Sequence, residues 1–306
     1  METNKEKIRK ICERFFIPKT LNDCYEFFRI YAECFFRFIE NQAIKDETQI
    51  SRRDAKLVTQ MIFTKTLSLK KILEGIDYNS HDELKLNTII DPTIIAILVR
   101  SIYETVLMFN VVYIQPKTDD ERLILYNLWV HSGLSFRQRF KYNTTSKANK
   151  EKLDDELLQM EQLKTEIHNT SLYKSLSETN KKRIETRLKG RDYKIIFDEN
   201  NDIQILHWQD IPIKMGLREG LFNNIYTYFS IYAHPSNVAV FQFQDMFKEN
   251  TAFINLTMFN SKSVFILLGA FIADLLKLFP ELLSVFEKLP YYYQISISFQ
   301  WRTYQR

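Results

Sequence analysis

The sequence of 306 residues contains only six glycines and seven prolines. A fold built from many short strands needs frequent turns, and these two residue types are typical of turns. Their scarcity, together with 24 Phe and 16 Tyr, favours long helices packed around an aromatic core. We therefore predict a mainly α fold, a multi-helix bundle that forms a single helical domain over residues 1–306.

Cysteine is also scarce. The three residues Cys12, Cys24 and Cys34 form no CxxC pair, which indicates free thiols in a reducing compartment rather than a disulfide framework. The polar start of the chain, METNKEKIRK, is not typical of a signal peptide. We therefore expect a cytoplasmic protein. The net charge of +4 is smaller than that of a dedicated nucleic-acid binder and decides little.

Several motifs of known chemistry are missing. The sequence has neither GxGxxG nor GxxxxGK[ST], the loops that cradle phosphates. Its five histidines are widely spaced, with no HExxH and no Cys/His cluster, and no GxSxG elbow is present. We therefore expect no metal and no small-molecule cofactor.

What the sequence has in abundance is helical periodicity. Apolar residues three and four apart predict helices over residues 3–16, 21–43, 51–75, 93–115, 119–143, 147–167, 174–189, 220–234 and 261–287. The helices between 145 and 192 carry many charges and little apolar surface, which indicates a charged helical hairpin inserted into the bundle. Residues 77–87 are typical of a turn, and the region of Phe241 and Phe243 is expected to be a loop.

Two stretches change to a period of two, which is typical of strands. Residues 193–208 predict a β-hairpin, and in 291–304 apolar residues alternate with polar ones from Gln294 to Arg302. We predict that the two form one small β element. Alternatively, the tail strand pairs with its counterpart in a second subunit and forms a homodimer, since an unpaired apolar edge promotes aggregation.

Two predicted helices, 93–115 and 261–287, are apolar enough to suggest membrane spans. Arg100 and Glu104 lie near the middle of the first, and Asp274 and Lys277 interrupt the second. Charges within a bilayer are costly, so we expect core helices and no membrane association. Arg100 and Glu104 are four residues apart, hence on one helix face, and they form either a structural ion pair or part of a polar site.

The stretch GLFNNIYTYFSIYAHPS, residues 220–236, contains the best site candidate. Ser230 and His234 lie on the same helical face. Pro235 disfavours the helical conformation for His234, which should leave the imidazole at the helix C-terminus. A helix end is favourable for a cation, so His234 is either a capping residue or a base. Ser230 is its neighbour in a local contact or a dyad.

The segments LVRSIYE (98–104) and YTYFSIYAHPS (226–236) resemble a family of uncharacterised, all-helical bacterial domains. Their helices carry Arg-x-x-x-Glu and Ser-x-x-x-His-Pro patterns, and the resemblance covers roughly residues 50–140 and 210–245. At greater distance the arrangement is similar to HEPN domains of toxins and antiphage defence systems, many of them metal-independent ribonucleases. Those carry Arg followed by His after four to six residues, a spacing that no arginine of this chain has.

The HEPN resemblance implies a protein that acts on RNA. In that case His234 would take the proton of a ribose 2′-hydroxyl, Arg100 would stabilise the charge on the phosphate, and Glu104 would orient one of them. The product would be a 2′,3′-cyclic phosphate. The alternative is a non-catalytic protein-interaction or regulatory module in which the same residues form a polar core network.

Basic residues form a second candidate surface. The stretch KKRIETRLKGRDYK, residues 181–194, is rich in Lys and Arg and could follow a phosphate backbone, although a solvated helix face has the same composition. The predicted nucleic-acid contacts are Lys181, Lys182, Arg183 and Arg187, together with Arg137 and Arg139.

Overall fold

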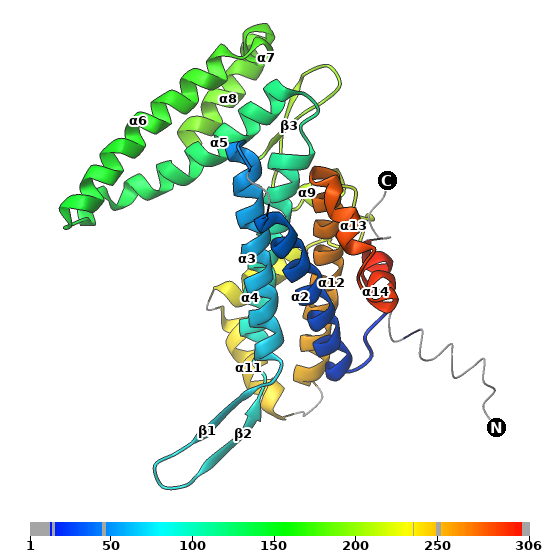
Figure 1. The fold of residues 1–306 in the computed structure, drawn as a ribbon. Coiled ribbons are helices and arrows are strands. Elements are labelled where there is room, and N and C mark those ends of the chain that lie inside the picture. The colour runs from blue at the N-terminus through cyan, green and yellow to red at the C-terminus, as the bar shows by residue number, and fades with distance from the viewer. Residues whose placement is uncertain (1–12, 14–15, 45–46, 235, 249–251, 302–306) are drawn as a thin grey trace. The chain divides into compact units, whose positions relative to one another are not determined.

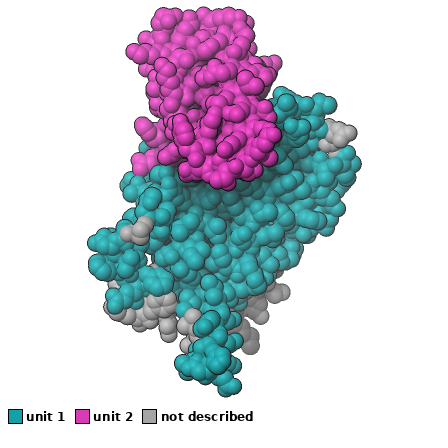
Figure 2. All heavy atoms as spheres, turned by 90° about the vertical axis from the view of Figure 1, so that its left-hand side faces the viewer, with its two compact units in different colours: residues 1–107, 212–306 teal, residues 108–211 magenta. Residues whose placement is uncertain are grey.

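The computed structural model describes residues 13, 16–44, 47–234, 236–248 and 252–301 (Figure 1). Its elements are mostly helices, with two small two-stranded sheets, so the predicted mainly α fold is confirmed. The predicted helix at 3–16 lies almost entirely outside the described residues. The chain divides into two compact units, residues 1–107 with 212–306 (unit 1) and residues 108–211 (unit 2), coloured separately in Figure 2.

The core of unit 1 is built on helix α2, Leu21–Ala43, which has the bounds that its periodicity predicted. It begins with a capping box in which the Thr20 hydroxyl accepts the Asp23 N–H at 3.1 Å and the Asp23 carboxylate accepts the Thr20 N–H at 2.9 Å. Its aromatic stripe is buried against α12, Ala252–Leu278. The Tyr31 hydroxyl donates to the Phe265 carbonyl at 2.8 Å, and the two rings stack 5.9 Å apart.

Helices α3, Ile50–Ile72, and α4, Pro92–Phe109, complete this side of unit 1. Asp91 caps α4 as predicted, since its carboxylate accepts the Thr93 N–H at 2.8 Å. The segment between the two helices was expected to be a turn. It forms an antiparallel hairpin of β1, Ile76–Asn79, and β2, Lys85–Ile89.

Two predictions in the second half of unit 1 need correction. The helix expected from Gly220 begins only at Ile225, as α10, Ile225–Ala233, because the preceding residues form turns in which Gly220 and Asn224 have positive φ. The loop expected around Phe241 and Phe243 is helix α11, Asn237–Lys248.

The strand predicted at 291–304 is wrong over residues 291–301, and residues 302–304 lie outside the described residues. Residues Tyr291–Trp301 form helix α14. Its buried residues Tyr293, Ser296, Ile297 and Gln300 follow helical spacing, and the other alternating apolar residues, Ile295, Phe299 and Trp301, lie half-buried around them. Tertiary packing against α12 therefore outweighs the period of two in the sequence. The expected homodimer through this strand loses its structural basis.

Unit 2 contains α5, Asp119–Arg137, followed by the 3₁₀ helix η2, Gln138–Asn143, and α6, Lys147–Asn169. Helices α7, Ser171–Ser175, and α8, Glu178–Gly190, lead to the hairpin β3–β4, Ile195–Phe197 and Ile203–Ile205. The predicted charged hairpin and the predicted β-hairpin at 193–208 thus both lie in unit 2. The charged helices α6 and α8 contribute to a hydrophobic core, because Ile167, Ile184 and Leu188 pack with Ile124 and Ile203.

Four shorter helices lie between these elements in the described part of the chain. A π-helix, η1, Asn110–Ile114, directly follows α4, and α9 spans Ile211–Lys214. The 3₁₀ helix η3, Pro280–Leu282, and α13, Leu283–Phe286, lie between α12 and α14.

In the described part of the chain, two helical segments are long and apolar enough to cross a bilayer, Pro92–Ile114 and Phe253–Leu278. Their mean hydropathies are 1.7 and 1.6, and 67% of each apolar window is buried inside the protein. Such burial is what the sequence predicted for core helices.

Candidate functional site

The two charged residues of α4 form an ion pair. Arg100 Nε donates to Glu104 Oε1 at 3.0 Å, and the side chains are 20% and 34% exposed. Burial opposes the charge of Arg100, but the hydrogen bond and the charge of Glu104 outweigh it and raise the pKa of Arg100. The sequence left open whether this pair is structural or belongs to a polar site.

A tyrosine from α10 completes the pair. Arg100 Nη2 donates to the Tyr226 hydroxyl at 2.8 Å, and the guanidinium carbon lies 4.8 Å from the centre of the Tyr226 ring. Burial, followed by the negative charge of Glu104, raises the pKa of Tyr226, and Arg100 counteracts this in part. The guanidinium is therefore fixed both at its edge and at its face.

A lysine from α3 approaches the same stretch of α4. Lys65 Nζ donates to Thr105 Oγ1 at 2.7 Å and to the Ser101 carbonyl at 3.2 Å. Burial lowers the pKa of Lys65, and the charge of Glu104 counteracts this. We name Lys65, Arg100, Glu104 and Tyr226 the Arg100 cluster; it joins α3, α4 and α10 within unit 1.

Ser230 and His234 lie further along α10. His234 closes the helix as predicted, with extended backbone angles and its N–H donating to the Ser230 carbonyl at 3.2 Å. The Ser230 hydroxyl donates to the Tyr226 carbonyl at 2.7 Å instead of to the imidazole. This contact corresponds to a local hydrogen bond rather than a dyad.

The predicted meeting of Arg100 and His234 is not among the contacts of the described residues. Arg100 binds the residue at position 226, which precedes His234 by eight positions. At a rise of about 1.5 Å per residue this corresponds to about 12 Å along the helix. His234 is exposed, so the two groups face different surroundings at the two ends of α10.

On α8, two of the predicted nucleic-acid contacts are used by the fold. Arg183 donates to the Ile203 carbonyl at 2.6 Å and ties α8 to the β-hairpin, and Arg187 pairs with Asp192 at 2.6 Å. Both side chains are half-buried. The charged groups of both arginines are therefore mainly engaged in contacts within unit 2.

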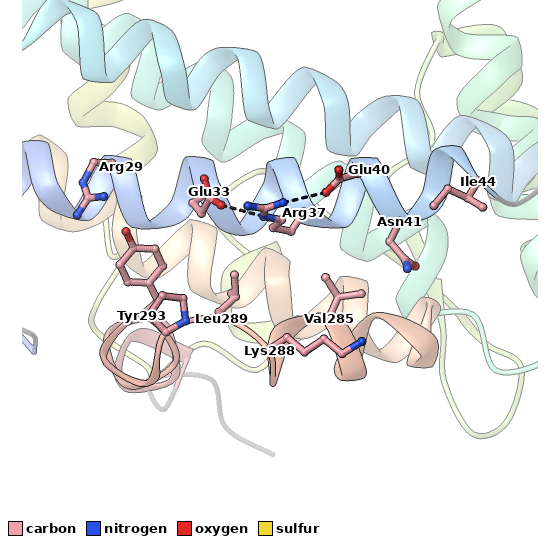
Figure 3. Close-up of a pocket in the computed structure, with 11 residues that line it drawn as sticks. Arg29, Glu33, Arg37, Glu40, Asn41, Ile44, Val285, Lys288, Leu289 and Tyr293 are labelled. Carbon is pink, nitrogen blue, oxygen red and sulfur yellow. Dashed lines mark hydrogen bonds and ion pairs between the residues drawn. The ribbon is translucent and has the colours of Figure 1, made fainter.

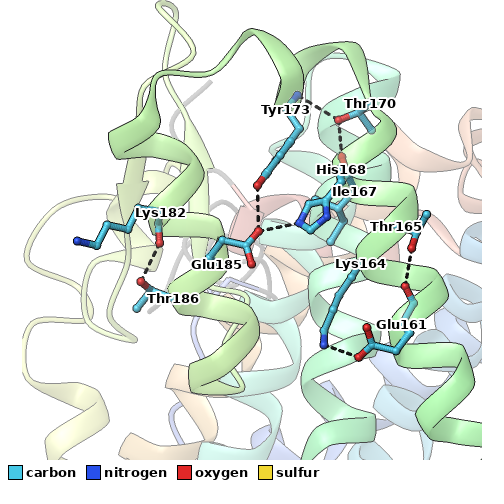
Figure 4. A network of polar contacts seen from close by, with 10 residues as sticks. All are labelled: Glu161, Lys164, Thr165, Ile167, His168, Thr170, Tyr173, Lys182, Glu185 and Thr186. Atoms are coloured by element: carbon cyan, nitrogen blue, oxygen red, sulfur yellow. Dashed lines mark hydrogen bonds and ion pairs between the residues drawn. The ribbon is translucent and has the colours of Figure 1, made fainter.

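The exposed part of α8 lies beside a polar network (Figure 4). His168 of α6 and Tyr173 of α7 both bind Glu185 of α8, at 2.7 Å and 3.0 Å, and thereby hold three helices together. Lys181 pairs with Glu178 at 2.9 Å. Lys182 is exposed and points away from this network, so it is the predicted α8 contact best placed to meet a ligand; Lys189 of the same helix is also exposed.

The region of Arg137 and Arg139 differs from α8 because aromatic residues accompany the charges. Phe136, Phe140 and Tyr142 are 50%, 62% and 97% exposed. Arg137 and Arg139 lie between the first two rings in sequence, and Lys141 lies between the last two. We name residues 136–142, at the end of α5 and in η2, the 136–142 segment. The segment thus carries both exposed aromatic rings and cations.

Two of these cations are anchored. Arg137 makes a two-pronged ion pair with Glu156 of α6, whose side chain is only 6% exposed, and Lys141 pairs with Asp154 at 2.9 Å. Arg139 is exposed and makes no hydrogen bond or ion pair with a described residue. The anchors fix η2 against α6, and Arg139 remains available to an anion.

A pocket of about 290 Å³ lies beside the segment, between η2 and the first half of α6. Its lining consists of Arg137, Phe140, Thr144, Asn149, Lys152, Leu153 and Glu156. Asn149 and Lys152 are exposed, and their side chains have no hydrogen-bond partner among the described residues. The pocket therefore combines one aromatic ring, one unused amide and one unused cation.

A larger groove of about 700 Å³ lies in unit 1 between α2 and the segment from α13 to the start of α14 (Figure 3). Its cations are largely matched by carboxylates: Arg37 binds Glu33 at 2.9 Å and Glu40 at 3.1 Å, and Arg29 binds Glu26. This groove offers less net positive charge than the 136–142 segment. In the described ranges, no group of three or more His, Cys, Asp or Glu residues could hold a metal ion.

Sequence reasoning missed Tyr226, Lys65 and the exposed rings of the 136–142 segment. Tyr226 lies four residues before Ser230, on the face already singled out, and the sequence itself shows the aromatic and basic residues of 136–142 close together. For Lys65 the sequence offers no signal, because its partner Thr105 lies 40 residues away.

Residues 91–251 match the model of DUF5677, a family of unknown function, which confirms the predicted resemblance to an uncharacterised helical family. The match includes Arg100, Glu104, Tyr226 and the whole 136–142 segment. No curated protein and no solved structure matches the chain.

Proposed function

The chain belongs to the DUF5677 family, whose function is unknown, and we propose that it binds single-stranded RNA through the 136–142 segment of unit 2. One observation carries the proposal: three aromatic rings, 50–97% exposed, lie among three cations within seven residues. Large apolar side chains exposed together on a surface are typical of an interaction site.

The chemistry of the segment suits a nucleic-acid strand. Bases stack on exposed aromatic rings, and each stacked base contributes roughly 1–3 kcal/mol. Basic side chains between the rings meet the phosphates that connect the bases. Arg139, which has no partner among the described residues, is the cation best able to do so.

A single strand is the expected form of the ligand, because bases within a duplex have their faces covered by neighbours. We propose RNA rather than DNA as the ligand because of the resemblance to HEPN domains. The same resemblance suggests a role in a toxin or antiphage system. A cytoplasmic location, proposed from the free thiols, agrees with such a ligand.

The test is fluorescence anisotropy with a labelled 12-nucleotide single-stranded RNA, the DNA of the same sequence and an RNA duplex. We expect the single-stranded RNA to bind, and Tyr142→Ala to weaken its binding by roughly fivefold or more. Tyr142 is 97% exposed, so this variant should keep its fold. The control is Tyr78→Ala, which removes a 63% exposed ring from β1 in unit 1 and should leave binding unchanged.

The salt dependence separates charge from stacking. For a single strand, each phosphate contact contributes about 0.7 to the slope of log affinity against log salt. Arg139→Ala should therefore reduce the slope by about 0.7, whereas Tyr142→Ala should leave it unchanged. Absence of RNA binding by the wild-type protein would overturn the proposal and favour the alternative, a module that binds protein through the same aromatic surface.

RNA cleavage at the Arg100 cluster is a second candidate, favoured by a guanidinium that is held in place yet remains 20% exposed. Incubation of RNA with the protein in excess chelator, beside Arg100→Ala and His234→Ala, tests it. Cleavage that disappears in both variants supports the predicted ribonuclease. Cleavage that survives His234→Ala excludes His234 as the base, and no cleavage by the wild type leaves the protein an RNA binder.

A further inference from the structure

We infer that Arg191, at the end of α8, is a second phosphate contact of the bound RNA, beside Arg139 and Tyr142. The inference rests on the proposed RNA binding and extends that surface from η2 to a neighbouring helix of unit 2. Its support comes from the faces of η2, from the contact of Arg191 with α5, and from the backbone conformation of Arg191.

Two faces of the 3₁₀ helix η2 are turned towards α6. Residues three apart eclipse one another in such a helix, so Gln138 and Lys141 share a face. Gln138 Nε2 and Lys141 Nζ each donate to an oxygen of α6, at 2.8 Å and 2.9 Å. Arg137, the last residue of α5, and Phe140 share the next face and line the pocket beside α6. Only one face of η2 is therefore left without a neighbour on α6.

Arg139 and Tyr142 share this third face, and both are exposed. A cation and an aromatic ring thus lie next to each other along η2, where a strand can place a phosphate on one and its base on the other. Ser135 precedes Arg139 by four residues, about one helical turn, and so lies on nearly the same side of α5. A residue bound to Ser135 extends the third face along α5.

Arg191 is that residue. Its Nε donates to Ser135 Oγ at 3.2 Å, and its carbonyl accepts the Ser132 hydroxyl at 2.6 Å. The side chain is exposed, and its two Nη groups have no hydrogen-bond partner among the described residues. Ser135 and Arg139 are about 6–8 Å apart along the helix axis. The Arg191 guanidinium is therefore held one turn from Arg139 with both Nη groups available to an anion.

The backbone of Arg191 is also unusual. It has φ 56° and ψ 46°, the left-handed conformation in which glycine is the usual residue after a helix. The chain has a glycine one position earlier, but Gly190 is still part of α8, and the arginine takes the strained position. Strain of this kind is found often at binding sites. Here it accompanies a side chain that leaves α8 for Ser135 of α5.

The experiment measures anisotropy with the labelled 12-nucleotide RNA between 50 and 200 mM salt, for the wild-type protein and for Arg191→Gly. Glycine suits the left-handed conformation, so this variant should keep its fold, which far-UV circular dichroism checks. We expect it to bind roughly threefold weaker or more at 50 mM salt. The slope of log affinity against log salt should be smaller by about 0.7, the contribution of one phosphate contact.

Three control variants separate the charge of Arg191 from its backbone and its surroundings. Asn201→Gly makes the same backbone change at an exposed left-handed residue between β3 and β4, and it should leave affinity and slope unchanged. Arg191→Lys keeps the charge but loses the planar fork, so it should keep most of the slope. Lys189→Ala removes an exposed cation that has no hydrogen bond or ion pair with a described residue, and it should reduce the slope less than Arg191→Gly does.

The outcomes distinguish this inference from the proposed RNA binding. If the wild-type protein binds no RNA, the proposed function fails and the inference fails with it. If Tyr142→Ala weakens binding but Arg191→Gly keeps the full affinity and slope, RNA binding stands and the contact at Arg191 is refuted. An equal loss of slope in Lys189→Ala would also refute it, because the end of α8 would then act only as a diffuse positive charge.

Discussion

We expect substitution by alanine to lower the free energy of unfolding at Gly269, where α12 and α14 cross, and to raise it at Gly133 of α5. A Cβ atom added to Gly269 of α12 would lie 3.0 Å from the Gln300 Cβ and 3.1 Å from the Trp301 backbone nitrogen. Backbone atoms can withdraw only if the whole of α14 shifts, so Gly269→Ala overpacks the crossing, at a cost of roughly 1–3 kcal/mol. Replacing glycine by alanine within a helix stabilises the protein by about 1 kcal/mol. We therefore expect a net loss of roughly 0–2 kcal/mol.

Gly133 of α5 is the matched control. A Cβ atom there meets no other atom within 4 Å, so Gly133→Ala should give only the gain of about 1 kcal/mol. The two variants should thus differ in the free energy of unfolding by the packing cost alone, roughly 1–3 kcal/mol. Urea denaturation followed by far-UV circular dichroism measures both, and hydrogen exchange of the α14 amides shows whether the loss at Gly269 is local.

Equal stabilisation by the two substitutions would refute this reasoning. It would mean that residues 291–301 do not pack against Gly269, and the predicted tail strand would have to be considered again. A loss that Gly269→Ala shows without lower protection of α14 would place the strain elsewhere on α12.

Three further predictions concern buried polar groups. His131 is 2% exposed, and neither of its ring nitrogens has a hydrogen-bond partner among the described residues. Burial, aided by Lys164, lowers its pKa from about 6.5, so the stability that the neutral ring allows is lost as the pH falls below about 6.5. His131→Leu should be at least as stable at pH 7.5 and should show a smaller loss between pH 7.5 and 5.5 in urea denaturation; an unchanged pH dependence contradicts this. Tyr226→Phe removes the hydroxyl bonded to Arg100 but keeps the ring beneath it, so unfolding should become easier by about 1 kcal/mol, while Tyr78→Phe on the exposed hairpin should change nothing. Lys65→Met keeps the length of the side chain but removes a partly buried charge, so the free energy of unfolding at pH 7 should stay equal or rise. A loss above about 1 kcal/mol would show that the hydrogen bond from Lys65 to Thr105 outweighs the cost of desolvating the ammonium group.

The sequence was sufficient for the helices whose local signals agree with their packing. In α2 the capping residues Thr20 and Asp23 and the aromatic stripe all indicate the same helix, and its bounds were predicted correctly. Asp91 marks the start of α4 in the same way. Where propensity, capping and periodicity coincide, tertiary contacts add stability without changing the element.

The tail shows why such reasoning fails elsewhere. From Gln294 to Trp301 a strict alternation suggested a strand, yet α14 buries Ser296 and Gln300 and leaves Ile295 and Phe299 half-buried. A helix packed on several sides shows no clear apolar stripe. The deciding partner, Gly269 on α12, lies about 30 residues away, and no local pattern reveals that the two helices cross there.

The site was predictable only within single helices. Arg100 and Glu104, four residues apart, pair as the spacing allows, whereas Tyr226 comes from a helix more than 100 residues later and takes the place that His234 was expected to fill. The sequence identified the right helices, since both α4 and α10 contribute. Which residue of α10 faces Arg100 depends on how the two helices pack, and the sequence does not contain that information locally.

The two proposed roles can be separated because their residues belong to different units. Tyr226 lies in unit 1 and Tyr142 in unit 2, so Tyr226→Phe should lower stability without changing RNA affinity, and Tyr142→Ala should do the reverse. Effects of independent sites add to within about 0.5 kcal/mol. In the double variant, measured by anisotropy and urea denaturation, both effects should therefore equal those of the single variants. If the RNA affinity of the double variant differs from that of Tyr142→Ala by more than this, the Arg100 cluster also takes part in binding. RNA cleavage at the Arg100 cluster requires such participation.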